Sequence, residues 1–273
     1  MGIRVVEQFV EAKSDGRMSE DLVVVTDDFA AVIDGASDAT GAMFAGKTGG
    51  RFGAEIVATA IAELSAADDA RQFVDAISSA LAAAVAATVG ELGDDTRWPA
   101  AVVACASAHR REVWRVGDCN VVIGDDEHAG GKRIDAATYS FRAATNAALL
   151  AKGVPLSELV EDDPGARAMR PLVDNQQHLA NTVGPWGFGC VNGQRVPDEY
   201  LEVLSVPSGP TEIIITSDGY PDVRSTLRAS EARLFELVDQ DPASIGELWP
   251  IGKSTKPGAN APDDRAYLRF ILT

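Results

Sequence analysis

Acidic residues stand at the ends of several short apolar stretches, and this recurrence is the feature of the sequence that could do chemistry. The residues concerned are Glu20, Asp21, Asp34, Asp118, Asp218 and Asp263. Taken singly each is ordinary, because Asp followed by Gly is common turn chemistry. If the strand ends converge, they assemble hard oxygen ligands without histidine or thiolate, a set that suits Mg²⁺ or Mn²⁺ rather than zinc.

The first two stretches predict a hairpin that brings acidic residues together. Runs 22–26 and 29–33 are apolar or β-branched, and only a pair of aspartates separates them. In a symmetric hairpin the numbers of facing residues sum to 55, so that Asp21 faces Asp34. With Glu20 just beyond, three carboxylates meet at one end of two adjacent strands, and something should neutralise their mutual repulsion.

Composition narrows the class of protein. The chain has 273 residues, of which 46% are apolar and 24% charged, as in ordinary soluble globular proteins. Its net charge of −17 argues against nucleic acid or a membrane surface as the main partner and favours divalent cations. Neither a membrane span nor the apolar region of a signal peptide is visible. We expect a cytoplasmic protein whose cysteines, Cys105, Cys119 and Cys190, are buried thiols.

The remaining patterns predict the elements that must position the acidic residues. Helical spacing of apolar residues is expected at 51–65, 73–89, 141–152, 166–180 and 229–239. Further strands are expected at 101–106, 112–116, 120–123, 201–206, 212–216 and 266–272. Strands in hairpins, with helices in separate blocks, indicate an α+β fold rather than a doubly wound parallel sheet. No interdomain linker is visible, so we expect one domain over residues 1–273, least regular at about 135–200.

In their order along the chain these motifs resemble the metal-dependent serine/threonine protein phosphatases of type 2C, the PPM family. Glu20-Asp21 resembles the family's early Glu-Asp pair, and run 29–35 resembles its strand that ends in Asp-Gly. Val116-Gly117-Asp118 is similar to a Val-Gly-Asp strand that contributes to a further metal position. The most specific segment is 214–223, which is close to the family's Ser-Asp-Gly-x-x-Asp-Val signature, and Asp263-Asp264 is similar to its closing motif.

This resemblance implies a four-layer α-β-β-α sandwich, with two mostly antiparallel sheets flanked by helix pairs and two metal ions in the site. Asp34 would bridge the two ions, and Gly35 would offer its backbone carbonyl. Asp218 and Asp263 would bind the first ion. Glu20, with Asp21 beside it, would serve the second ion, and Asp118 would assist an additional, weaker one.

The function implied is Mn²⁺- or Mg²⁺-dependent hydrolysis of phosphoserine or phosphothreonine in proteins, or of a small phosphoester. The ions would activate a bridging water for in-line attack on phosphorus. Arg17 is the candidate for binding the phosphate, although it lies three residues before Glu20 where the family usually has four. A His that many members carry after Asp-Gly is absent, since Gly35 is followed by Ala36-Ser37-Asp38. These departures leave an alternative open, a catalytically weak or inactive relative that serves as a protein-binding module.

A second motif offers a different enzyme class. Residues 41–48 satisfy the P-loop pattern G-x-x-x-x-G-K-[ST], in which Lys47 would reach the phosphates of a nucleotide. The context disfavours a P-loop NTPase, because residues 34–40 separate the motif from its strand and Gly49-Gly50 disfavour a helix directly after it. We expect a flexible loop that leads into the helix at 51–65.

Three further features are weaker. By the family resemblance the irregular segment would hold a flap beside the site, so that His178 is a candidate for substrate contact. Trp186 and Phe188 could line a pocket, although core packing is the commoner role of such residues. The acidic run 161–163 is expected to be solvated.

Overall fold

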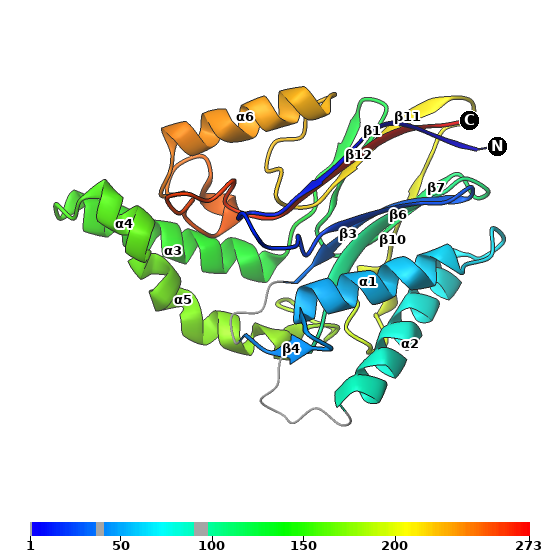
Figure 1. The fold of residues 1–273 in the computed structure, drawn as a ribbon, viewed down its shortest axis with the longest axis horizontal. Helices are drawn as coiled ribbons and strands as arrows, with labels where there is room; N and C mark the ends of the chain where they lie inside the picture. The colour runs from blue at the N-terminus through cyan, green and yellow to red at the C-terminus, as the bar shows by residue number, and fades with distance from the viewer. Residues whose placement is uncertain (1, 37–40, 90–97) are drawn as a thin grey trace.

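Two five-stranded antiparallel sheets packed face to face form the centre of the computed structural model, which describes residues 2–36, 41–89 and 98–273 (Figure 1). The first sheet has the order β1-β12-β11-β8-β9, with β1 Ile3–Glu11, β12 Arg265–Leu272, β11 Thr211–Thr216, β8 Asn120–Ile123 and β9 Asp126–His128. The second sheet has the order β10-β7-β6-β3-β2, with β10 Glu202–Ser205, β7 Glu112–Val116, β6 Ala101–Ser107, β3 Phe29–Gly35 and β2 Leu22–Val25.

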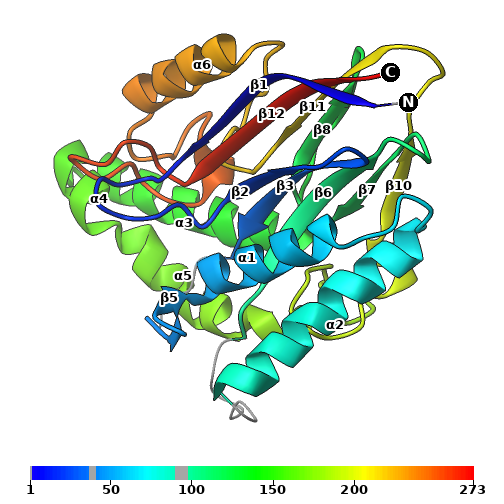
Figure 2. The ribbon, with the colours of Figure 1, turned by 45° about the vertical axis from the view of Figure 1, so that its right-hand side comes forward.

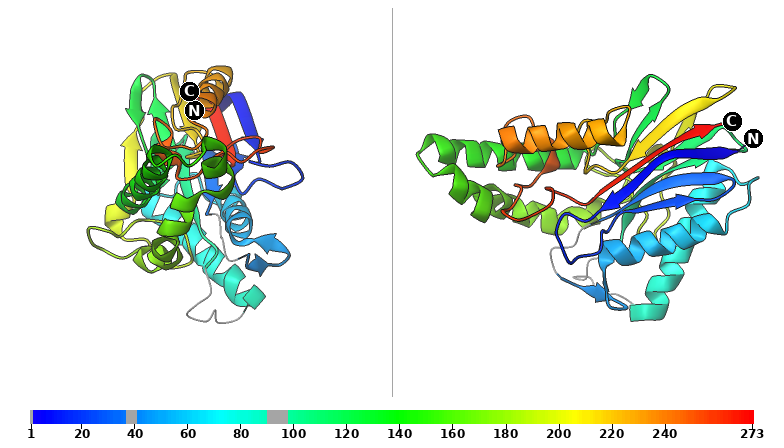
Figure 3. Two further views of the ribbon diagram at one scale, coloured as in Figure 1. Left: turned by 90° about the vertical axis from the view of Figure 1, so that its left-hand side faces the viewer. Right: turned by 45° about the horizontal axis from the view of Figure 1, so that its top comes forward.

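Helices cover the outer faces of the two sheets. Helices α1 (Gly49–Ala62) and α2 (Ala70–Val89) lie against the second sheet, and α6 (Leu227–Gln240) lies over the first (Figure 2). This arrangement confirms the predicted α+β sandwich. Helices α3 (Arg133–Ala151), α4 (Leu156–Asp162) and α5 (Pro164–Asn175) reach out beyond the sheets (Figure 3). Together with the short 3₁₀ helix η1 (Gln176–Leu179) they form what we call the arm, residues 133–179.

Strand β3 of the second sheet is buried on both faces, which explains its continuous apolar sequence. Phe29, Ala31 and Ile33 pack in the layer beneath α1 and α2. Ala30 and Val32 face the other sheet, because successive side chains of a strand point to opposite faces. The register of the β2–β3 hairpin pairs Leu22 with Ile33, which confirms the predicted sum of 55.

Most predicted elements are present, and the arm differs most from the prediction. Helix α3 begins at Arg133 rather than near 141, and the short helix α4 was not predicted. All three cysteines are buried free thiols, as expected. Among the described residues, no helix combines the length and apolar character needed to cross a membrane.

The segment with the P-loop pattern folds as a hairpin, so the prediction of a flexible loop was wrong. Strands β4 (Met43–Phe44) and β5 (Lys47–Thr48) pair with each other, and Lys47 forms an ion pair with Glu55 of α1. Thr48 caps α1 by accepting a hydrogen bond from the Arg51 backbone at 3.3 Å. Lys47 is therefore engaged by a carboxylate and does not lie in a phosphate-binding loop.

The two glycines that were expected to disfavour a helix instead begin one. A Cβ on Gly50 would lie 2.8 Å from the backbone oxygens of Gly35 and Ala36. A Cβ on Gly35 would lie 2.5 Å from the Gly50 oxygen. Close backbone contact between the end of β3 and the start of α1 therefore requires glycine at both positions, and this packing outweighs the low helix propensity of glycine.

Candidate metal and phosphoester site

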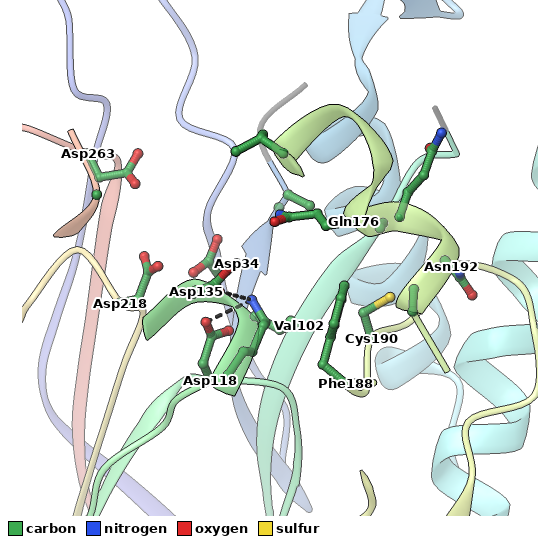
Figure 4. A pocket seen from close by; sticks show the side chains of 18 of the residues that line it. Asp34, Val102, Asp118, Asp135, Gln176, Phe188, Cys190, Asn192, Asp218 and Asp263 are labelled. Carbon is green, nitrogen blue, oxygen red and sulfur yellow. Dashed lines mark ion pairs between the residues drawn. The ribbon is translucent and has the colours of Figure 1, made fainter. Parts of the chain in front are cut away.

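A pocket of about 520 Å³ lies where strand ends of both sheets meet the arm (Figure 4). Six of the predicted site residues line it: Asp21, Asp34, Gly35, Asp118, Asp218 and Asp263. Asp135 and Asp264 also line it. The structure therefore brings together carboxylates that are far apart in the sequence.

Strand pairing explains why these carboxylates converge. Strands β11 and β12 are antiparallel neighbours with Thr216 opposite Tyr267, so the residues after β11 and before β12 emerge at the same end. Asp218 and Asp263 stand at these positions. The Ala266 backbone donates a hydrogen bond to Ser217 Oγ at 2.9 Å, which fixes the two turns against each other.

The second sheet contributes its acidic residues in the same way. Asp34 belongs to the last part of β3, and Asp21 directly precedes the paired strand β2. Asp118 follows Gly117 in the tight turn between β7 and β8. Gly117 has a φ of 94°, and a Cβ there would lie 2.2 Å from Val102 Cγ1, so only glycine fits this turn.

Mutual repulsion and burial make these carboxylates hard to ionise together. Desolvation and the charge of Asp21 hold the pKa of Asp34 well above its ordinary value. Desolvation raises the pKa of Asp21 as well, and its buried Oδ2 has no hydrogen-bond partner. Asp218 is open to the pocket, yet desolvation among the surrounding protein atoms and the charge of Asp263 raise its pKa to about 7. A bound cation would remove this penalty.

Three lysines supply positive charge around the pocket, and sequence reasoning identified none of them. Lys253 forms an ion pair with Asp263, and Lys13 Nζ lies 3.1 Å from Asp263 Oδ1. Desolvation alone would raise the pKa of Asp263, but these two ammonium groups lower it below its ordinary value. Lys132 Nζ lies 2.7 Å from Asp118 Oδ2 and 3.5 Å from Asp135 Oδ2.

Two of the predicted site residues lie outside the pocket lining. Glu20 is buried beside the pocket, and its backbone N–H donates to Asp264 Oδ2 at 2.8 Å. Asp264 also accepts a hydrogen bond from the Lys13 backbone at 2.8 Å, so this aspartate ties the segment after β1 to the site. Arg17 is exposed in that segment and does not line the pocket. The absent His was expected shortly after Gly35. Ser37 and Asp38, which stand there in this sequence, lie outside the described residues.

The arm provides the opposite wall of the pocket, which combines the Asp135 carboxylate with polar and apolar side chains. Gln176, Gln177 and His178 of η1 line it, so His178 reaches the pocket as expected. Phe188 lines it as well, whereas Trp186 stacks on the Arg133 guanidinium with 4.6 Å between the Arg133 Cζ atom and the ring centroid.

A buried polar network holds the arm in place and corrects the prediction for the acidic run. Asp163 is 7% exposed and pairs with Arg142, whose side chain is fully buried. Asp163 also accepts hydrogen bonds from Asn146 of α3 and from Ser254, near the pocket residue Lys253. The acidic run therefore contains an anchor, and only its other members, Glu161 and Asp162, are exposed.

The residues present fit a hard divalent cation at one part of the pocket. Among the described residues, no lysine forms an ion pair with Asp21, Asp34 or Asp218, and the partnerless Asp21 Oδ2 is an oxygen that a cation would satisfy. In the part of the chain that the structure describes, no three such residues already stand in metal-binding arrangement. Both oxygens of Asp263 are instead engaged by lysines, Oδ1 by Lys13 and Oδ2 by Lys253.

Comparison with known proteins defines the class of fold. No family model and no curated protein matches the sequence. Solved structures do match over the full length, and they show that the chain has the fold of the PPM serine/threonine phosphatases. At 13–15% identity this likeness concerns the fold.

Three of these structures are the following. The catalytic domain of the serine/threonine phosphatase PstP, in complex with two manganese ions, is 15% identical with a TM-score of 0.51, over 100% of this chain and 99% of that one. MsPP from Mycobacterium smegmatis, a PPM phosphatase in complex with cacodylate, is 14% identical with a TM-score of 0.50, over 99% and 100%. Stp1 from Staphylococcus aureus is 13% identical with a TM-score of 0.50, over 100% and 98%.

Proposed function

We propose that this protein is a metal-dependent phosphatase that hydrolyses phosphoserine or phosphothreonine in proteins. The observation that carries the proposal is the convergence of Asp21, Asp34, Asp118, Asp218 and Asp263 in one pocket of a PPM phosphatase fold. The PstP structure with two manganese ions supports Mn²⁺ as the cofactor, and carboxylate oxygens suit Mg²⁺ equally. When bound, such ions supply an activated water and neutralise charge on the phosphoryl group.

The carboxylates proposed to hold the ions line the pocket or lie directly beside it, and of these Asp263 already pairs with lysines. Asp34 lies between the carboxylates of the two sheets and would contact both ions, with the Gly35 carbonyl beside it. Asp218 and Asp263 would complete the ligands of one ion. Asp21, with the nearby Glu20, would complete the ligands of the other. Asp263 would have to exchange an ammonium partner for the ion, which frees Lys253.

Recognition of the phosphate is assigned to Lys253 rather than to Arg17. Among the described residues that line the pocket, the permanently charged cations are Lys132 and Lys253. The Lys132 side chain is 19% exposed and lies between two carboxylates, whereas that of Lys253 is 36% exposed and contacts Asp263. Lys253 therefore has the freedom to reach a substrate phosphate, while His178 and Gln177 would contact the group that carries it.

The alternative, a binding module without activity, is favoured by one observation. Lysines already neutralise Asp263, so a folded and stable pocket does not require metal there. Such a module would bind a phosphoprotein without turning it over.

The test is hydrolysis of a phosphothreonine peptide by purified protein, with Mn²⁺ and with excess chelator, by wild type and by Asp34→Asn. The matched control is Asp75→Asn on α2, whose side chain is 52% exposed and does not line the pocket. We expect Mn²⁺-dependent turnover in wild type and control, and loss of about 10²-fold or more in Asp34→Asn. Tight Mn²⁺ binding without turnover would establish the binding module instead.

A further inference from the structure

Lys132 is fixed inside the acidic pocket by contacts on several sides. Its Nζ lies 2.7 Å from Asp118 Oδ2 and 3.5 Å from Asp135 Oδ2, and the two carboxylate side chains are only 9% and 12% exposed. The ring centroid of Phe188 lies 5.7 Å from the same nitrogen. The ammonium thus joins the β7–β8 turn, the first turn of α3 and the aromatic wall of the pocket.

The backbone explains why Lys132 returns to Asp118. Gly130 donates a backbone hydrogen bond to Asn120 Oδ1 at 3.0 Å, and a Cβ on Gly130 would lie 1.9 Å from the backbone oxygen of Asp118. Gly130, two residues before Lys132, therefore packs directly on the backbone of the β7–β8 turn. Asp135 follows on the same helix three residues later, a spacing that places it beside Lys132.

Each of the two carboxylates that contact Lys132 has one oxygen without a hydrogen-bond partner. Asp118 Oδ1 and Asp135 Oδ1 are buried and have no hydrogen-bond partner. Without the lysine, the Asp118 and Asp135 carboxylates would face one point, and oxygen ligands of this kind suit a hard divalent cation. With the lysine, that point is occupied by a covalently tethered charge, and a divalent ion there would be repelled by the ammonium.

We propose that the Lys132 ammonium permanently replaces a metal ion at Asp118, so that this protein binds one divalent ion fewer than its carboxylates could hold. The inference rests on the proposed function only for the count of ions in the wild type. On this proposal Asp118 does not assist an additional, weaker ion, in contrast to what the family resemblance implies. Lys132 is then a positioning residue. Its ammonium joins Asp118 of the β7–β8 turn to Asp135 of the arm, and unlike a bound ion it cannot dissociate into the solvent.

The test compares the number of Mn²⁺ ions bound by chelator-treated protein, measured by calorimetry and by equilibrium dialysis. We expect Lys132→Met to bind one ion more than wild type, which should bind two. The matched control is Arg133→Met, the next residue, whose guanidinium stacks on Trp186, and it should bind the wild-type number. Equal numbers in wild type and folded Lys132→Met would overturn the proposal.

The design separates this proposal from the proposed function. A wild type that binds no Mn²⁺ contradicts the metal-dependent phosphatase, but the difference of one ion between wild type and Lys132→Met still decides the role of Lys132. If Lys132→Met does not fold, Lys132→Gln keeps a hydrogen-bond donor to Asp118 and removes the charge. It should also gain one ion, and thermal unfolding with Mn²⁺ should then rise more in this variant than in wild type.

Discussion

Replacing Asp163 by Asn should destabilise the protein strongly, because it removes the charge partner of a fully buried arginine. Asp163 Oδ2 accepts hydrogen bonds from Arg142 Nε at 3.0 Å and Nη2 at 2.7 Å. Its Oδ1 accepts from Asn146 Nδ2 at 2.9 Å and from the Ala166 backbone at 3.0 Å, at the start of α5. Asn keeps the size of the side chain and tolerates the left-handed backbone at this position, where φ is 41°. The substitution therefore removes the charge and turns one of the two accepting oxygens into a donor, while size and backbone are kept.

The expected magnitude follows from burial. The Arg142 side chain is fully buried and that of Asp163 is 10% exposed, so solvent cannot screen the charge left behind. Breaking such a buried pair by removing one partner costs about 3–5 kcal/mol. The control Asp162→Asn affects an ion pair with Arg167 whose side chains are 57% and 59% exposed, and it should change stability by less than about 1 kcal/mol.

The assay is urea unfolding of wild type and both variants at neutral and acidic pH. Desolvation would raise the pKa of Asp163, but the hydrogen bonds from Arg142 and Asn146 lower it below its ordinary value. The stabilisation is therefore fully present above the unfolded-state pKa of about 4 and is lost as the pH falls through the lowered folded-state value. The difference between wild type and Asp163→Asn should shrink in that range. A neutral-pH loss no larger than that of Asp162→Asn would refute the reasoning.

Three further predictions concern the pocket and its surroundings. Lys253→Met should raise KM for a phosphopeptide about tenfold or more, whereas Arg17→Met should leave KM nearly unchanged. A larger rise of KM in Arg17→Met than in Lys253→Met would restore Arg17 as the phosphate-binding residue. Gly50→Ala should lower the free energy of unfolding, measured by urea titration, by about 2 kcal/mol or more, because the new methyl group would collide with the Gly35 backbone. A loss under about 0.5 kcal/mol would contradict that contact. Lys47→Met should change neither phosphopeptide hydrolysis nor nucleotide binding, and saturable ATP binding that depends on Lys47 would revive the P-loop interpretation.

The sequence was most informative where apolar residues alternate or repeat. The β2–β3 register could be read directly, because its residues are apolar on both faces and its turn is short. Asp218 and Asp263 could be placed at strand ends for the same reason. Their convergence with Asp34 needed the pairing of strands distant in the sequence, which the family resemblance supplied.

The arm could not be predicted in the same way because its buried face is polar. Helix α3 buries Thr138, Arg142 and Asn146 at four-residue spacing, so a search for apolar periodicity misses its first half. Lys132 and Asp135 were missed with it, although their i,i+3 spacing at a helix start is a usable signal once the helix is known. Lys253 lies in an irregular segment, and nothing local in the sequence brings it to Asp263.

A metal-dependent phosphatase site at this cluster is tested most directly by turnover of a phosphothreonine peptide by Asp218→Asn compared with wild type, in Mn²⁺ and in chelator. Asp218 stands at the end of β11 and lines the pocket among the other carboxylates. We predict that wild type turns over only with Mn²⁺, and that Asp218→Asn loses both turnover and Mn²⁺ affinity while its circular dichroism and thermal unfolding in chelator are unchanged. Unaltered turnover in folded Asp218→Asn would contradict a metal-dependent phosphatase site at this cluster.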